Sequence, residues 1–108
     1  MELGLGGRPQ THYLETDLGY LAYQVFGEGE RDIMFVTGAL SNVDAIWDEP
    51  SAVRFFDRLG TMGRVIQYDM RGSGVSDPIP GRTMWMTIEE NVDDLRSVLR
   101  AAGSERAV

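Results

Sequence analysis

Short apolar runs near the start of the chain predict strands. Residues 11–15 and 20–26 flank a Thr-Asp-Leu-Gly segment that is typical of a hairpin turn. Residues 33–36 are continuously apolar, as expected of a strand buried on both faces. Residues 64–69, Arg-Val-Ile-Gln-Tyr-Asp, predict a fourth strand, which runs directly into a glycine-rich turn.

Two later stretches have the three-to-four-residue spacing of amphipathic helices. The first begins at Pro50, after a predicted loop over 38–48, and ends at Gly60. Its predicted buried positions are Val53, Phe56 and Leu59. The second covers 88–102, follows a capping box of Thr87 and Glu90, and ends at Gly103. Its predicted apolar stripe is Ile88, Val92, Leu95, Leu99 and Ala102. Asp93 and Asp94 lie off this stripe and are expected to be solvated or paired with Arg96 or Arg100.

The element order β-β-β-α-β-α predicts an α/β fold, with a mixed, mostly parallel sheet and helices on its faces. Residues 1–10 hold three glycines and a proline and are expected to form a flexible lead-in. Residues 11–108 then form one domain, because 108 residues leave no room for a second.

Composition and charge exclude several functions. The net charge of −7 and the pI near 4.5 argue against nucleic-acid and membrane-surface partners, since both attract clustered positive charge. No cysteine is present, so disulfides, thiolate metal sites and a cysteine nucleophile are excluded. Neither a signal peptide nor an apolar run of bilayer-spanning length is visible, and a cytoplasmic location is expected.

Two segments carry a resemblance to a known family. One is the strand that ends in Phe-Val-Thr-Gly at residues 35–38, and the other is the Asp-x-Arg-Gly-x-Gly-x-Ser segment over 69–76. Together with the closing residues 103–108, they resemble the N-terminal half of α/β-hydrolase proteins, and the resemblance covers 11–108. The chain is also similar, less closely, to hydrolase-like domains joined to bacterial nucleotide cyclases.

The family's catalytic residues have no counterpart in this chain. The family uses a Gly-x-Ser-x-Gly nucleophile elbow with a histidine and an acid. None of the six serines has glycine both two residues before it and two residues after it, and Ser76 comes nearest, with Gly74 two before and Pro78 two after. The only histidine, His12, lies in the first strand, whereas the family's histidine lies far downstream. His12 is interpreted as a surface or edge residue.

The loop after the third strand matches the family's oxyanion loop. The resemblance implies that the backbone N–H of Ala39 is one oxyanion-hole donor, although Thr37 departs from the family's usual residue. The alternative is that Gly38 only turns the chain out of a buried strand. Leu40 and Trp47 are candidates for lining a substrate pocket, and core packing is the favoured role for Trp47.

The segment after the fourth strand allows three interpretations. In the family it is a structural turn, which assigns bracing roles to Asp69, Arg71, Gly72 and Gly74. Turn aspartates commonly accept backbone N–H bonds, and this interpretation is favoured. A dinucleotide fingerprint is disfavoured, because Asp77 occupies the third glycine position and would repel a pyrophosphate. Paired catalytic or metal carboxylates, Asp69 with Asp77, are the third alternative; no metal or cofactor is expected.

The resemblance also implies a strand order of 1-2-4-3, with the second strand antiparallel. The third strand would then lie at an open edge, and that edge is an apolar template for another strand. The residues along it are Ile33, Met34, Phe35 and Val36. Two partners are open: the remaining half of the domain, or a second copy of the chain.

The leading hypothesis is the N-terminal half of a serine-type hydrolase of ester or amide-like bonds, catalytically incomplete alone. The alternative is a non-catalytic, hydrolase-like sensor or interaction module that dimerises or regulates a partner domain. A Gly-x-Ser-x-Gly segment beyond residue 108 would favour the hydrolase, and its absence the module.

Overall fold

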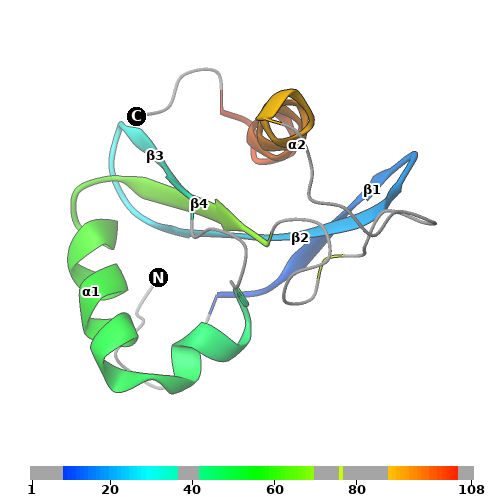
Figure 1. Ribbon diagram of the computed structural model, residues 1–108. Helices are drawn as coiled ribbons and strands as arrows, with labels where there is room; N and C mark the ends of the chain where they lie inside the picture. The colour runs from blue at the N-terminus through cyan, green and yellow to red at the C-terminus, as the bar shows by residue number, and fades with distance from the viewer. Residues whose placement is uncertain (1–8, 37–41, 70–75, 77–87, 105–108) are drawn as a thin grey trace.

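A computed structural model describes residues 9–36, 42–69, 76 and 88–104 of the chain. Its elements follow the predicted order, with one addition between the third strand and the first helix (Figure 1). The strands are β1 (His12–Thr16), β2 (Gly19–Gly27), β3 (Asp32–Val36) and β4 (Arg64–Tyr68). The helices are α1 (Pro50–Gly60) and α2 (Ile88–Ala101), and the addition is η2 (Ala45–Asp48), a 3-10 turn inside the predicted loop over 38–48.

The four strands form one sheet in the order β1-β2-β4-β3, which confirms the predicted order. The β1–β2 and β2–β4 pairs are antiparallel, whereas β3 and β4 are parallel. Three strands therefore run in one direction and β2 runs against them. Residues 9 and 10 belong to the predicted lead-in, yet Pro9 is fully buried and its carbonyl oxygen accepts the Gln24 Nε2 donor.

Helices cover both faces of the sheet, as predicted, with α1 and α2 on opposite sides of it (Figure 1). Alternation along β4 produces two separate cores, because successive side chains point to opposite faces. On the α1 face, Val65 of β4 packs with three aromatic residues, Phe26, Trp47 and Phe56. On the α2 face, β4 packs with Leu21 of β2 and Val98 of α2, through Ile66 and Tyr68.

The buried face of α2 is rotated from the predicted one. Val98 is completely buried and Val92 is 39% exposed, whereas the predicted stripe included Val92 and omitted Val98. Asp94 is buried as well, at 8% exposure, so of the two alternatives predicted for it the solvated one was wrong. The apolar residues of this helix are spread widely enough to fit two stripes, and the contact with Tyr68 and Leu21 selects the one through Leu95 and Val98.

The predicted end of α2 at Gly103 is confirmed by its geometry. Gly103 has φ +75°, and its N–H donates to the Arg100 carbonyl over 3.1 Å. The Ser104 N–H donates to the Leu99 carbonyl over 2.9 Å. These two bonds form a Schellman motif, in which a left-handed glycine ends the helix and satisfies its last carbonyls.

The end of β2 lies in very close contact with the turn that joins α1 to β4. Gly27 has φ +88°, and the Glu28 N–H donates to the Gly60 carbonyl over 2.9 Å. A Cβ atom on Gly27 would lie 2.5 Å from the Gly63 carbonyl oxygen and 2.7 Å from the Gly60 Cα. Only glycine fits here, because both the backbone conformation and the lack of space exclude a side chain.

We predict that Gly27→Ala destabilises the protein by about 3 kcal/mol, because strain at positive φ adds to a backbone clash. Gly103→Ala is the matched control, since its φ is also positive but no atom lies within 4 Å of the added Cβ. This control should lose only about 1 kcal/mol. Urea unfolding followed by circular dichroism measures both, and equal losses would show that the close contact at Gly27 is unimportant.

Candidate functional site

The candidate site lies at the carboxyl ends of β3 and β4, where open α/β sheets bind their ligands. Asp69 follows β4 directly, and Val43 precedes η2 in the connection that leaves β3. Of the residues predicted here, Ala39, Leu40, Arg71, Gly72 and Gly74 lie outside the described part of the chain. Asp69 and Trp47 are described, and they show what holds this end of the sheet together.

The Asp69 carboxylate holds the start of the segment that contains η2. Its Oδ1 and Oδ2 atoms both accept the Val43 N–H, over 2.9 and 3.1 Å. Asp69 and Val43 are both buried, at 0% and 1% exposure. A hydrogen bond to a carboxylate of this kind is shorter and stronger than one between neutral groups, and losing it would remove a partner from a buried side chain. The contact has the form expected of the structural role, in which a turn aspartate accepts a backbone N–H.

Ser76, which follows β4 in the chain, is hydrogen-bonded to both Asp69 and β2. Its Oγ accepts the Ala22 N–H over 2.8 Å and donates to the Asp69 carbonyl over 2.6 Å. The side chain is 7% exposed. The serine that comes nearest to an elbow in sequence is therefore committed to two structural hydrogen bonds, and it has no activating base beside it in the described residues.

A buried amide network supports the site from the α1 face of the sheet. The Gln24 Oε1 atom accepts the Trp47 Nε1 donor over 2.7 Å and the Gln67 Nε2 donor over 3.0 Å. Both glutamines are completely buried and directly opposite each other in the β2–β4 ladder. This network fixes the indole of η2 against the sheet, because losing the Gln24 acceptor would leave the buried indole N–H without its hydrogen bond.

Trp47 is thus a core residue in this structure. It is 7% exposed and packs edge-on against Phe26, with ring centroids 5.1 Å apart. His12 lies on edge strand β1, with β2 between it and β4, and its ring contacts Tyr23 at a centroid distance of 5.3 Å. It is exposed, as expected of a surface residue.

Sequence reasoning missed three buried polar residues near the site: Gln24, Gln67 and Asp94. The burial of Gln24 could have been predicted from the sequence. Side chains two residues apart in a strand point to the same face, so Gln24 lies on the same face as Ala22 and Phe26. Asp94 lies on the α2 face together with Tyr68. The pKa of Tyr68 is raised, first by its burial and second by the negative charge of Asp94. Tyr68 therefore stays neutral in the physiological range.

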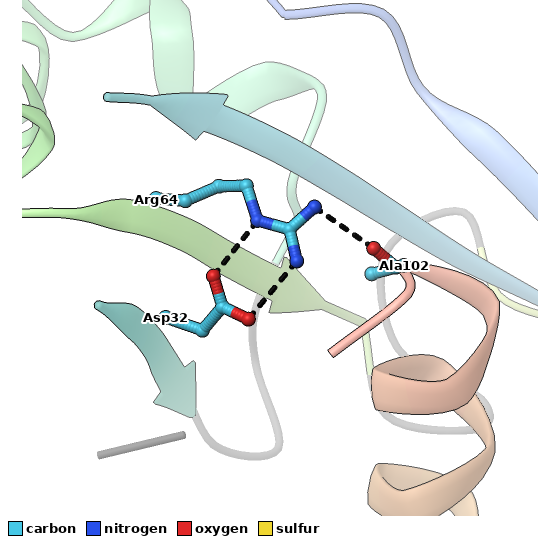
Figure 2. Close-up of polar contacts among 3 residues, drawn as sticks. All are labelled: Asp32, Arg64 and Ala102. Atoms are coloured by element: carbon cyan, nitrogen blue, oxygen red, sulfur yellow. Dashed lines mark hydrogen bonds and ion pairs between the residues drawn. The ribbon is translucent and has the colours of Figure 1, made fainter. Parts of the chain in front are cut away.

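A set of hydrogen bonds made by Arg64 joins the amino ends of β3 and β4 to the end of α2 (Figure 2). Arg64 Nε and Nη2 donate to the two Asp32 carboxylate oxygens over 2.8 and 3.0 Å. Arg64 Nη1 donates to the Ala102 carbonyl over 2.9 Å. Hydrogen bonds from Arg64 and, second, from the Ser104 hydroxyl lower the pKa of Asp32 to about 2. The same pairing raises the pKa of Arg64.

The described residues contain no group of three or more histidine, cysteine or acidic side chains placed to hold a metal ion. Among the same residues, no helix is both long and apolar enough to cross a membrane.

Comparisons with known proteins identify the fold. Neither a protein-family model nor a curated protein matches the chain. Solved structures do match. The N-acyl homoserine lactonase AidH complexed with N-butanoyl homoserine has a TM-score of 0.72 at 23% identity, over 92% of this chain and 34% of that one. A hydrolase from Pseudomonas aeruginosa has a TM-score of 0.68 at 26% identity, over 90% and 34%.

A third similar structure is the proline iminopeptidase-related protein from Thermus thermophilus, with a TM-score of 0.66 at 27% identity, over 94% of this chain and 35% of that one. Other similar structures are described as α/β hydrolases. This chain therefore has the fold of the N-terminal part of α/β hydrolases. It spans about a third of the length of the proteins that it matches.

The low pKa of Asp32 predicts a loss of stability in acid. Because folding lowers this pKa from 3.8 to about 2, the stabilisation is complete above about pH 4 and disappears as the pH falls toward 2. We expect Asp32→Asn to be less stable than the wild type by about 1 kcal/mol at pH 5, a value discounted for partial exposure. Urea midpoints at pH 5 and near pH 2 should show this difference shrinking, and a constant difference would contradict the assignment.

Proposed function

We propose that this chain is the N-terminal part of a serine-type hydrolase of ester, lactone or amide bonds, and that it is catalytically incomplete by itself. The observation that carries the proposal is the Asp69–Val43 contact at the carboxyl ends of β3 and β4. α/β hydrolases place an oxyanion donor in the connection that follows β3. This contact holds the far end of that connection at Val43, and β3 holds its near end at Val36.

In the proposed reaction, a serine attacks the substrate carbonyl carbon and negative charge develops on the carbonyl oxygen. The role assigned to this chain is to offer the Ala39 N–H to that oxygen. One such donor is worth about 10²–10³ in kcat, because it is aimed in advance at the charge that develops. The serine and the histidine that takes its proton must come from elsewhere, since no elbow and no downstream histidine occur in these residues.

The comparisons support a carbonyl substrate. The similar structures include a lactonase, named for N-acyl homoserine lactones, and a protein related to proline iminopeptidase. Both names refer to cleavage of a bond at an acyl carbon, and the proposal extends that class of bond, but no particular substrate, to this chain. A cytoplasmic, cofactor-independent enzyme remains part of the proposal.

A fluorophosphonate probe tests the proposal, because it reacts only with an activated serine. The protein isolated from its source should be labelled on one serine, and mass spectrometry of its peptides should place that serine after residue 108. The 108-residue chain alone should not be labelled. Labelling of any serine within 1–108, or no labelling of the source protein, would contradict the proposal; the second result would favour the sensor or interaction module.

In this proposal, a further strand of the same protein pairs with the free edge of β3. Connections between parallel strands are almost always right-handed. The connection from β3 to β4 carries α1 on one face, and α2 covers the opposite face. The connection through α1 runs across the sheet from β3 to β4. A right-handed connection through α2, on the other face, must therefore run across the sheet in the reverse direction, from β4 past β3. The strand that follows α2 then lies at the β3 edge.

Two features of this edge support a partner. Val36 is 51% exposed at the end of β3, and Phe55 of α1, which contacts Phe35, is 50% exposed. β3 has no strand on its other side among the described residues. A row of unpaired backbone groups flanked by apolar side chains is a template for strand pairing.

We predict that the isolated 108-residue chain self-associates through β3, and that Val36→Lys reduces this association by placing a charge on the edge. Val92→Lys on α2 is the matched control, because Val92 is also exposed, at 39%, but lies away from the edge. Light scattering over a concentration series should show less association for the first variant only. A monomeric wild-type chain at high concentration would contradict this prediction.

A further inference from the structure

The Arg64–Asp32–Ala102 contact joins three elements that are far apart in the sequence. Figure 2 shows the Arg64 guanidinium between the Asp32 carboxylate of β3 and the Ala102 carbonyl at the end of α2. Arg64 and Asp32 are the first residues of β4 and β3, and they are direct neighbours in the parallel ladder. The side chains are partly enclosed, with 32% of Arg64 and 16% of Asp32 exposed.

The hydrogen bonds of Arg64 to Ala102 and to Asp32 have different roles. The last carbonyls of a helix lack partners within the helix, and the Arg64 Nη1 donor satisfies the one at Ala102. A positive charge at this end also complements the helix dipole. The planar guanidinium meets the carboxylate through two nitrogens while the third contacts the carbonyl. A lysine retains the charge but has no such fork.

The contact also determines where the chain leaves α2. Arg64 Nη1 donates to the Ala102 carbonyl over 2.9 Å and the same guanidinium binds Asp32, so the chain leaves α2 beside the first residues of β3 and β4. A strand that runs parallel to β3 must begin at this end of the sheet. The position of the exit therefore matches the start of a strand on the free edge.

We propose that Arg64 and Asp32 are positioning residues, which hold the end of α2 at the start of the β3 edge and so set where the next strand, and the nucleophile that follows it, begins. This inference rests on the proposed function for its catalytic consequence, whereas the docking of α2 does not. Neither residue touches substrate, since both lie at the amino ends of strands whose carboxyl ends carry the candidate site.

The test uses the protein as isolated from its source and its Arg64→Lys variant. Arg96→Lys is the control, because Arg96 is an exposed arginine of α2, the helix whose end Arg64 holds. Hydrogen exchange should become at least tenfold faster at the amides of residues 102–104 and of the segment after them in Arg64→Lys, and remain unchanged in the control. With an ester substrate, kcat should fall about 10- to 100-fold while KM changes less than about twofold, because the nucleophile is displaced rather than the binding surface.

Asp32→Glu provides the rescue arm, since it keeps a carboxylate opposite Arg64, and it should retain more activity than Asp32→Asn. Two results would overturn the inference: exchange in Arg64→Lys that matches the Arg96→Lys control, or faster exchange throughout the protein without a local increase at the end of α2. Failure of the proposed function has a different signature. The source protein would then lack a probe-reactive serine, and the exchange comparison would still decide whether Arg64 docks α2.

Discussion

Strand β4 is the element on which the rest of the structure depends. It is buried on both faces, and a hydrogen-bonded charged side chain at each end connects it to other elements. Its side chains build the α1 core through Val65 and the α2 core through Ile66 and Tyr68. At its start, Arg64 joins β3 to the end of α2, and just past its end, Asp69 holds the segment before η2. Burial of this apolar strand, at about 25 cal/mol per Å² of surface removed from water, supplies much of the stability.

The Asp69 and Arg64 contacts have different consequences for function. Asp69 organises the carboxyl end of the sheet, where the proposed oxyanion donor lies, whereas Arg64 organises the amino end, where the chain departs from α2. The first shapes the part of the proposed active site that this chain supplies. The second organises the amino end of the β3 edge, where the proposed next strand begins. In the proposed hydrolase, the serine and the histidine come from residues outside these 108, because neither a nucleophile elbow nor a downstream histidine occurs among them.

The sequence predicted most of the architecture, because the strands and helix ends carry strong local signals. Pro50 and Gly60 bound α1 as predicted, and Gly103 ends α2. The face of α2 was mispredicted, since the choice between Val92 and Val98 depends on contacts with β2 and β4 that no local pattern encodes. η2 was also missed, because its tryptophan is held by Gln24, a residue 23 positions away in the sequence.

Polar residues were the hardest to predict. The Arg64–Asp32 pair joins residues 32 positions apart, and its third partner is a backbone carbonyl, which has no signature in the sequence. Asp69 was interpreted as a turn residue by the resemblance, although its partner, Val43, became visible only in the fold. The buried pair of glutamines looks like ordinary polar alternation until the register places one opposite the other.

In the proposed arrangement, further residues of the same protein pair with the β3 edge and also bring the nucleophile. The intact mass of the protein isolated from its source tests this most directly. We expect a mass of roughly three times 12.0 kDa, because the chain spans about a third of the proteins that it matches. A mass of 12.0 kDa would contradict it, since no strand would then follow to cover β3 and no serine elbow would exist.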